Sequence, residues 1–156
     1  MLKKIKINKY NETIYYEKLD NGLDVYMWPN NNVSSYYATL SVKYGSVDTN
    51  FRIKNKTYEV SKGIAHFLEH VKFNEGPNRT AHEYFNKLGS SINAFTTFDY
   101  TSYEVTATDK IKENITHLLD YVQTPYFTKE LIEKERKIIL SEVKMGKNNP
   151  YQILYY

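Results

Sequence analysis

The chain has 156 residues, which is the size of a single domain and long enough to bury a hydrophobic core. Hydrophobic residues make up 41% and charged residues 25%; this balance excludes a disordered chain, and no stretch is apolar for long enough to predict a membrane-spanning helix. The formal net charge of +3 is too small to predict a nucleic-acid-binding protein, and the absence of cysteine excludes disulfides and thiolate metal sites, so that any metal would have to be held by His, Asp or Glu.

The first half of the chain is predicted to consist mainly of β-strands. Residues 13–19 and 23–28 are β-prone runs on either side of an Asp-Asn-Gly segment at 20–22. Because Asn-Gly tolerates the positive φ angles of a tight turn, these runs predict a hairpin. Residues 33–44 are rich in β-branched and aromatic residues and predict a longer strand. Residues 51–60 alternate only in part and carry many charges, so they predict an edge strand or a loop.

The second half is predicted to be mostly helical, with one further hairpin. Ser61 is a good helix N-cap, and Thr80 and Glu83 have the spacing of a capping box. Glycine and proline mark most of the helix ends. The expected elements are a helix from Ser61 to residues 74–77, a short helix from Thr80 to Gly89, a hairpin of strands 91–98 and 100–108, a helix from Ile111 to Pro125, and a helix from Thr128 to Met145 that Gly146 stops.

The order of these elements predicts the fold class. It lacks the strict alternation of strands and helices that a doubly wound fold shows. It instead predicts the α+β class, as a two-layer sandwich in which helices pack on one face of a mainly antiparallel sheet. We expect residues 1–156 to form a single domain.

Two of the four histidines stand in one five-residue segment, His66-Phe67-Leu68-Glu69-His70. Residues four apart lie on the same face of a helix, so both imidazoles can point at one spot with the Glu69 carboxylate beside it. Two imidazoles and a neighbouring carboxylate are what a catalytic zinc site needs, because the metal takes three protein ligands and a water from which the carboxylate removes a proton. The segment therefore predicts a metal-dependent hydrolytic site.

A third ligand can come from the last predicted helix. Glu135 and Glu142 are seven residues apart, which is close to two helical turns, so they share one face. A carboxylate from this face could complete a site of two His and one Glu, and the second Glu could hydrogen-bond a ligand histidine and fix its tautomer. Nitrogen and oxygen ligands suit zinc, but they also suit manganese or cobalt.

The simpler alternative is that the histidines have no chemical role. Helical histidines are usually surface residues or hydrogen-bonded core residues. His82 and His117 have no comparable partners in the sequence, so both are predicted to be ordinary helix-surface residues. The spacing of His66, Glu69 and His70 favours a metal site over this alternative.

Four segments resemble one known family. Residues 63–70 (GIAHFLEH) resemble the signature helix of the insulinase/pitrilysin family, the inverted zinc metallopeptidases with an HxxEH motif. Residues 43–46 resemble the strand end that precedes this helix, residues 87–96 its LG…NAxT strand, and residues 131–142 its ExExxVIxxE helix. The segments occur in the family's order and cover nearly the whole chain. The resemblance is nearest to the bacterial pitrilysin-like peptidases.

The resemblance implies a zinc-dependent metallo-endopeptidase, which hydrolyses peptide bonds through a metal-activated water. By position, His66, His70 and Glu142 would bind one zinc ion per chain. Glu69 would be the general base, and Glu135 would support a metal ligand.

The resemblance also implies how a peptide substrate binds. Asn93 and Ala94 would lie on a strand edge to which the peptide adds as an extra strand. That mode contacts the peptide backbone and implies little side-chain preference. From the residues alone, this segment would be an ordinary sheet strand.

The chain is shorter than complete members of the family. The resemblance therefore implies that residues 1–156 are an N-terminal catalytic domain, itself incomplete, and that a companion domain or subunit contributes to activity. The aromatic segment 150–156 predicts a continuation or an interface. The alternative function is a non-catalytic or truncated member that binds metal or peptide or serves as a partner subunit. We expect no nucleic-acid partner and no membrane partner, and a cytoplasmic location, because no apolar segment follows the basic N-terminus.

Overall fold

The computed structural model describes residues 2–147; the aromatic segment 150–156 lies outside them. The chain divides into two compact units, residues 1–34 and 35–156. The first unit holds an antiparallel sheet in the order β1-β2-β3, and a short 3-10 helix (Asn8–Tyr10) connects its first two strands. The strands are β1 (Lys3–Ile7), β2 (Glu12–Lys18) and β3 (Asp24–Met27).

The β2–β3 hairpin confirms the turn predicted at residues 20–22. Lys18 pairs with Asp24 across it, and Gly22 has a φ of 90°, which glycine adopts without steric cost. Strand β1 was not predicted, although Lys and Ile alternate along it with the period of a strand.

The second unit is built on a sheet in the order β4-β10-β9, with both pairings antiparallel. Its strands are β4 (Tyr36–Val42), β9 (Ser91–Thr96) and β10 (Thr101–Ala107). Tyr103 of the central strand stands opposite Leu40 on one side and Ala94 on the other. Since β10 lies in the middle, β9 is an edge strand whose second edge pairs with no strand in the described part of the chain.

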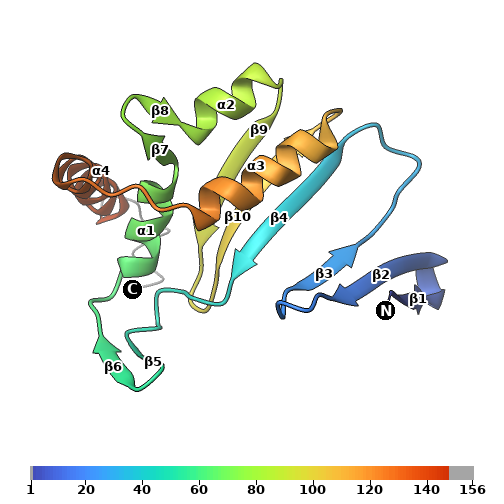
Figure 1. Cartoon of the computed structure of the whole chain (residues 1–156), viewed down its shortest axis with the longest axis horizontal. Helices are drawn as coiled ribbons and strands as arrows, with labels where there is room; N and C mark the ends of the chain where they lie inside the picture. The colour runs from blue at the N-terminus through green and yellow to red at the C-terminus, as the bar shows by residue number, and fades with distance from the viewer. Residues whose placement is uncertain (1, 148–156) are drawn as a thin grey trace. The chain divides into compact units, whose positions relative to one another are not determined.

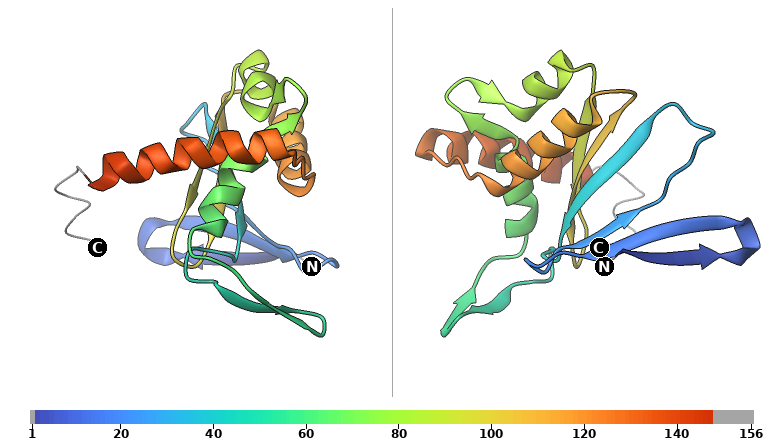
Figure 2. Two further views of the ribbon diagram at one scale, coloured as in Figure 1. Left: turned by 90° about the vertical axis from the view of Figure 1, so that its left-hand side faces the viewer. Right: turned by 45° about the vertical axis from the view of Figure 1, so that its right-hand side comes forward.

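Helices cover one face of this sheet (Figures 1 and 2). Helix α1 (Ile64–Lys72) packs on β9 and β10, α2 (Ala81–Lys87) on β9, and α3 (Ile111–Gln123) on β10 and β4. Helix α4 (Lys129–Lys147) packs across α1. The core between the layers consists of Ala81, Phe85, Ile92, Tyr103, Val105, Leu118, Tyr121 and Val122. The predicted α+β class, with helices on one face of an antiparallel sheet, is confirmed.

Two small hairpins flank α1. The first joins β5 (Asn50–Ile53) to β6 (Lys56–Glu59). The prediction of an edge strand or a loop at residues 51–60 is therefore wrong, because these residues form most of a hairpin. Lys54 in its turn has a φ of 54°, a conformation that lysine seldom takes, so that Asn55 is the only turn-favouring residue between the two strands. The second hairpin joins β7 (Asn74–Gly76) to β8 (Arg79–Thr80) and separates α1 from α2.

Three helix ends test the capping predictions. The Thr80–Glu83 capping box of α2 is present, with both hydrogen bonds made. The Thr128 hydroxyl accepts from the Leu131 N–H and so caps α4, which begins at Lys129, one residue after the predicted start. Helix α1, in contrast, begins at Ile64 after Gly63, which has a φ of 88°, and not at Ser61.

The predicted stop at Gly146 is also wrong, because α4 continues through this residue to Lys147. Glycine costs an exposed helix only about 1 kcal/mol relative to alanine, which does not by itself end the helix.

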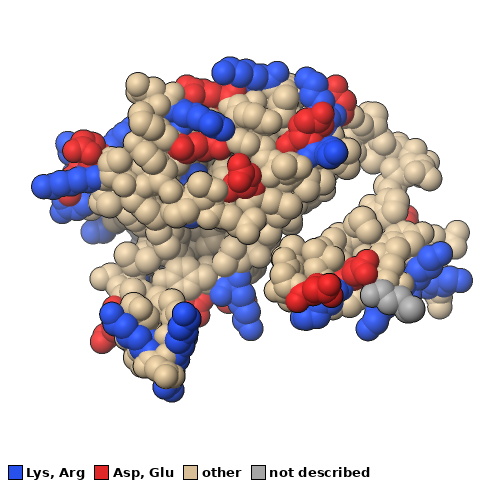
Figure 3. Space-filling view, in the orientation of Figure 1, with Lys and Arg blue, Asp and Glu red and all other residues tan. Residues whose placement is uncertain are grey.

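Charged side chains of both signs are interspersed over the helices on the face shown in Figure 3, whereas the β5–β6 hairpin presents mainly basic ones, from Arg52, Lys54 and Lys56. No helix within residues 2–147 is long and apolar enough to cross a membrane.

Candidate metal centre

The two histidines of α1 face the same point. They stand one helical turn apart, and the Nε2 atoms of His66 and His70 are 3.2 Å from each other. The ring planes are perpendicular, with centroids 4.7 Å apart, so the rings meet at their nitrogen tips and do not stack. The convergence expected from their spacing is therefore present.

Helix α4 brings Glu142 to this point. Because α4 crosses α1 (Figure 2, left), Oε2 of Glu142 lies 3.7 Å from Nε2 of His66 and 3.6 Å from Nε2 of His70. Atoms bound to one tetrahedral zinc at about 2.0–2.2 Å lie about 3.3–3.6 Å from one another. The three observed separations are close to this value, so the donor set and its geometry fit a zinc ion.

The three side chains also differ in exposure in a way that suits such a site. His66 and Glu142 are 40% and 38% exposed, whereas His70 is 19% exposed. Two of the three side chains are therefore accessible to solvent, as a catalytic zinc site requires and a closed structural one does not.

Glu135 lies on the other side of His70. Its Oε2 atom is 3.6 Å from Nδ1 of His70, and the side chain is almost fully buried. Of the two glutamates on the shared face of α4, the structure therefore brings Glu142 to the paired Nε2 atoms and Glu135 to the opposite ring nitrogen. A carboxylate at that nitrogen favours the tautomer with the proton on Nδ1, which leaves Nε2 free to bind a metal.

Glu69 occupies the sheet-facing side of α1, with only 6% of its surface exposed. Its Oε2 atom accepts a hydrogen bond of 2.6 Å from the Thr96 hydroxyl of β9. Tyr103, on the neighbouring strand, is buried, and its pKa is raised first by burial and second by the charge of Glu69. Both effects favour the neutral phenol of Tyr103.

A hollow of about 350 Å³ adjoins these residues. Its lining includes Glu69, His70 and Glu135 together with Asn93 and Ala94, the two strand residues expected to meet a substrate. The Asn93 side chain is exposed and that of Ala94 is half-buried. The hollow thus places Asn93 and Ala94 of β9 on the same surface as His70 and Glu69.

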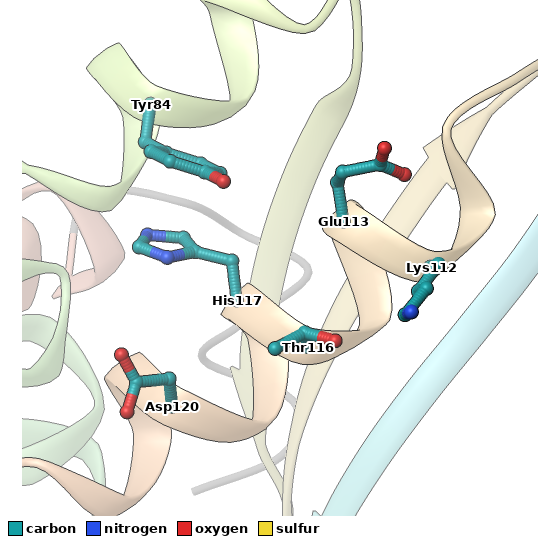
Figure 4. A pocket seen from close by; sticks show the side chains of 6 residues that line it. All are labelled: Tyr84, Lys112, Glu113, Thr116, His117 and Asp120. Carbon is teal, nitrogen blue, oxygen red and sulfur yellow. The ribbon is translucent and has the colours of Figure 1, made fainter.

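His117 was predicted to lie on the helix surface, and this prediction is wrong. The residue is buried, with 6% of its surface exposed. Tyr84 of α2 stacks on its ring with centroids 3.5 Å apart (Figure 4), and Nε2 lies 2.8 Å from Oε1 of the buried Glu75. Burial lowers the pKa of His117, although the Glu75 carboxylate acts in the opposite direction. The signal was present in the sequence, because residue 117 shares a helix face with the buried Asn114, Leu118 and Tyr121.

His82 is exposed on α2, as predicted, and stacks on Phe73 with ring centroids 4.6 Å apart. The residue that the sequence reasoning passed over is Thr96. It closes the family-like segment 93–96, but nothing in its spacing shows that it meets a helix residue 27 positions earlier.

Comparison with known proteins gives consistent results. A sequence model described as Insulinase (Peptidase family M16) matches residues 29–155. The uncharacterized zinc protease YmfH of Bacillus subtilis is 42% identical over 158 residues, which span 100% of this chain and 37% of that protein.

Solved structures agree. An M16-like peptidase from Alicyclobacillus acidocaldarius superposes with a TM-score of 0.84 at 36% identity over 99% of this chain and 34% of its own. A protease from Helicobacter pylori, at 24% identity, has the same fold with a TM-score of 0.74 over 93% of this chain and 34% of its own. The chain therefore spans about a third of the length of these proteins.

Proposed function

The chain belongs to the insulinase family of peptidases, and on that premise we propose that it carries the catalytic site of a zinc-dependent metallo-endopeptidase. The observation that carries this proposal is the meeting of His66, His70 and Glu142 at one point, with Glu69 on the next face of the same helix. The relatives' description as zinc proteases supports zinc as the metal.

In this proposal His66, His70 and Glu142 hold one zinc ion per chain. When bound, zinc supplies Lewis acidity that polarises the scissile carbonyl and makes a water molecule acidic enough to attack at neutral pH. Glu135 keeps the His70 ring oriented through Nδ1, so that Nε2 remains directed at the ion.

Glu69 is the proposed general base and acid. Its carboxylate takes a proton from the attacking water as the new carbon–oxygen bond forms. It then returns the proton to the amine nitrogen as the peptide carbon–nitrogen bond breaks. Its burial supports this role, since a carboxylate shielded from bulk water keeps a fixed direction.

The peptide is proposed to bind along β9. The second edge of this strand is unpaired within residues 2–147, and Asn93 and Ala94 line the hollow that leads to Glu69 and His70. An extended peptide added there would be held mainly by backbone hydrogen bonds.

We further propose that residues 1–156 are the N-terminal part of a catalytic domain that works with a companion domain or subunit. The support is the share of the relatives that the chain covers, which is 37% for the Bacillus protein. The same observation favours one second candidate, a member that binds metal or peptide without cleaving and contributes a surface to a partner peptidase.

The test combines metal analysis with cleavage of quenched fluorescent peptides that have no fixed structure. With the companion domain or subunit present, we expect the wild-type chain to hold zinc and cleave, Glu69→Gln to hold zinc and lose cleavage by about 10²–10⁴-fold, and His66→Ala to lose both. Zinc retained by His66→Ala would refute the ligand assignment. Zinc bound by a wild type that cleaves no peptide, even at high enzyme concentration, would favour the non-catalytic candidate.

A further inference from the structure

We propose that Thr96 is a positioning residue for Glu69, and this inference rests on the function proposed above. The Thr96 hydroxyl fixes one oxygen of the Glu69 carboxylate, so that the other oxygen performs the proton transfers. Thr96 itself contacts neither the metal ligands nor the reacting atoms in this assignment.

The first observation is the contact between the two layers of the fold. Thr96 ends the edge strand β9, Glu69 lies on α1, and the hydroxyl donates to Oε2 over 2.6 Å. A hydrogen bond to an ionised acceptor is short and about twice as strong as a neutral one. The bond therefore links the helix that bears the metal-ligand candidates to the strand where the peptide is proposed to bind.

The second observation is that Thr96 is itself held in place. Thr101 stands directly opposite it in the β9–β10 pair, and the two hydroxyl oxygens are 3.3 Å apart. Thr101 is buried, and its hydroxyl also lies 2.9 Å from the Tyr44 carbonyl oxygen, to which it donates. Threonine is restricted at χ1, so a packed hydroxyl with two fixed neighbours has little freedom to turn away.

Proton counting gives the direction of these bonds. Each threonine hydroxyl has a single hydrogen, and an ionised carboxylate has none. The short Thr96–Glu69 contact therefore requires the Thr96 hydrogen, and the hydrogen of Thr101 goes to the Tyr44 carbonyl oxygen. Thr96 is therefore the donor to Glu69, and its contact with Thr101 is one of packing.

The consequence is that the two oxygens of the Glu69 carboxylate have different roles. Oε2 is tied to β9, so Oε1 is the atom left to take the proton from water and to return it to the leaving amine. A general base must stay within hydrogen-bond distance of the proton that it moves, and a carboxylate held at one oxygen must break that hydrogen bond to rotate out of this geometry.

The decisive variant is Thr96→Val, which keeps the side-chain shape and removes the hydroxyl. Thr96→Ser restores a hydroxyl at the same place. Thr106→Val makes the same change at an exposed position on β10 and serves as the matched control. For each variant we would measure the zinc content of the purified chain, kcat and KM on a quenched fluorescent peptide with the companion domain or subunit present, and a crystal structure of the zinc-loaded protein.

If Thr96 positions Glu69, Thr96→Val keeps its zinc and its KM, loses about tenfold or more in kcat, and shows the Glu69 carboxylate rotated away from its wild-type position. Thr96→Ser recovers most of kcat, and Thr106→Val matches the wild type. A merely structural role would leave kcat unchanged in a folded, zinc-loaded Thr96→Val chain.

The crystal structures separate this inference from the proposed function. If the wild type binds zinc but cleaves nothing, the peptidase proposal fails for this chain, while the position of Glu69 in Thr96→Val still decides whether Thr96 orients it. A Glu69 carboxylate that stays in its wild-type position without the hydroxyl overturns the inference, whatever the activity.

Discussion

Two regions of the second unit place a histidine beside a carboxylate, with opposite results. In the metal centre, His66 and His70 point their Nε2 atoms at each other and at Glu142, and part of each ring remains accessible to solvent. Between α2 and α3, His117 lies under Tyr84 against the buried Glu75, with its pKa lowered by burial.

The comparison shows that a neighbouring carboxylate does not make a histidine a metal ligand. At His117 the imidazole of α3 packs against Tyr84 of α2 and the Glu75 carboxylate of β7, and the described residues bring no further possible metal ligand to its Nε2. At His66 and His70 the acidic partners come from a separate helix and leave one nitrogen of each ring directed at a shared point. Four experiments would break or sharpen this distinction.

The largest effect is expected on metal content. His70→Ala should reduce zinc from about one ion per chain to nearly none, because only two of the three proposed ligands remain. His117→Gln should leave zinc content unchanged. Atomic absorption on protein dialysed against stoichiometric zinc measures both, and loss of zinc from a folded His117→Gln chain would erase the distinction.

A smaller effect is expected at Glu135. Glu135→Gln retains the shape of the side chain but weakens the hold on Nδ1 of His70, so zinc affinity should fall about 10–100-fold. Glu133→Gln, at an exposed position on the same helix, is the matched control. Competition with a chelator gives both affinities; equal values for the two variants would show that Glu135 does not act on the metal centre.

Stability should respond at α2, the helix from which Tyr84 covers His117. Thr80→Ala removes half of the capping box and should lower the free energy of unfolding by about 1 kcal/mol, measured by urea denaturation. Zinc affinity should be unchanged, since α2 supplies none of the proposed ligands. A parallel loss of zinc affinity would mean that the two regions are coupled.

The smallest expected effect is on how steeply the free energy of unfolding depends on pH. His117 binds a proton less readily in the folded chain than in the unfolded one, where its pKa is about 6.5. The unfolded state therefore takes up more protons as pH falls through 6.5 towards the folded pKa, and the free energy of unfolding falls over this range. In His117→Phe that free energy should depend less on pH; an equal slope in both proteins would assign the dependence to other groups.

Much of the fold could be predicted, because its signals are local. The Thr80–Glu83 capping box and the turn at Gly22 each depend on a few consecutive residues, and both appear as expected. The predictions of secondary structure fail where the local sequence is compatible with more than one backbone conformation. The turn at Lys54 has a backbone conformation unusual for lysine, and Gly146 sits inside a helix although it is a common terminator.

The site was predictable to the extent that it lies on single helices. The i, i+4 spacing brings His66 and His70 together in any α-helix, and the seven-residue spacing gives Glu135 and Glu142 a common face. What spacing cannot give is the angle at which α4 crosses α1, and this angle decides which glutamate meets the Nε2 atoms. The Thr96–Glu69 bond and the burial of His117 likewise depend on packing between elements distant in sequence.

Under the proposed function, the edge of β9 that pairs with no strand within residues 2–147 has a consequence for which peptides could enter the site. A chain segment can add to a sheet only if its own amide and carbonyl groups are not already paired, so helices and strands inside folded domains cannot dock there. Selection would then act on the conformational freedom of a polypeptide more than on its side chains. Unfolded regions, loops and short peptides would be cleaved ahead of intact globular proteins of the same composition.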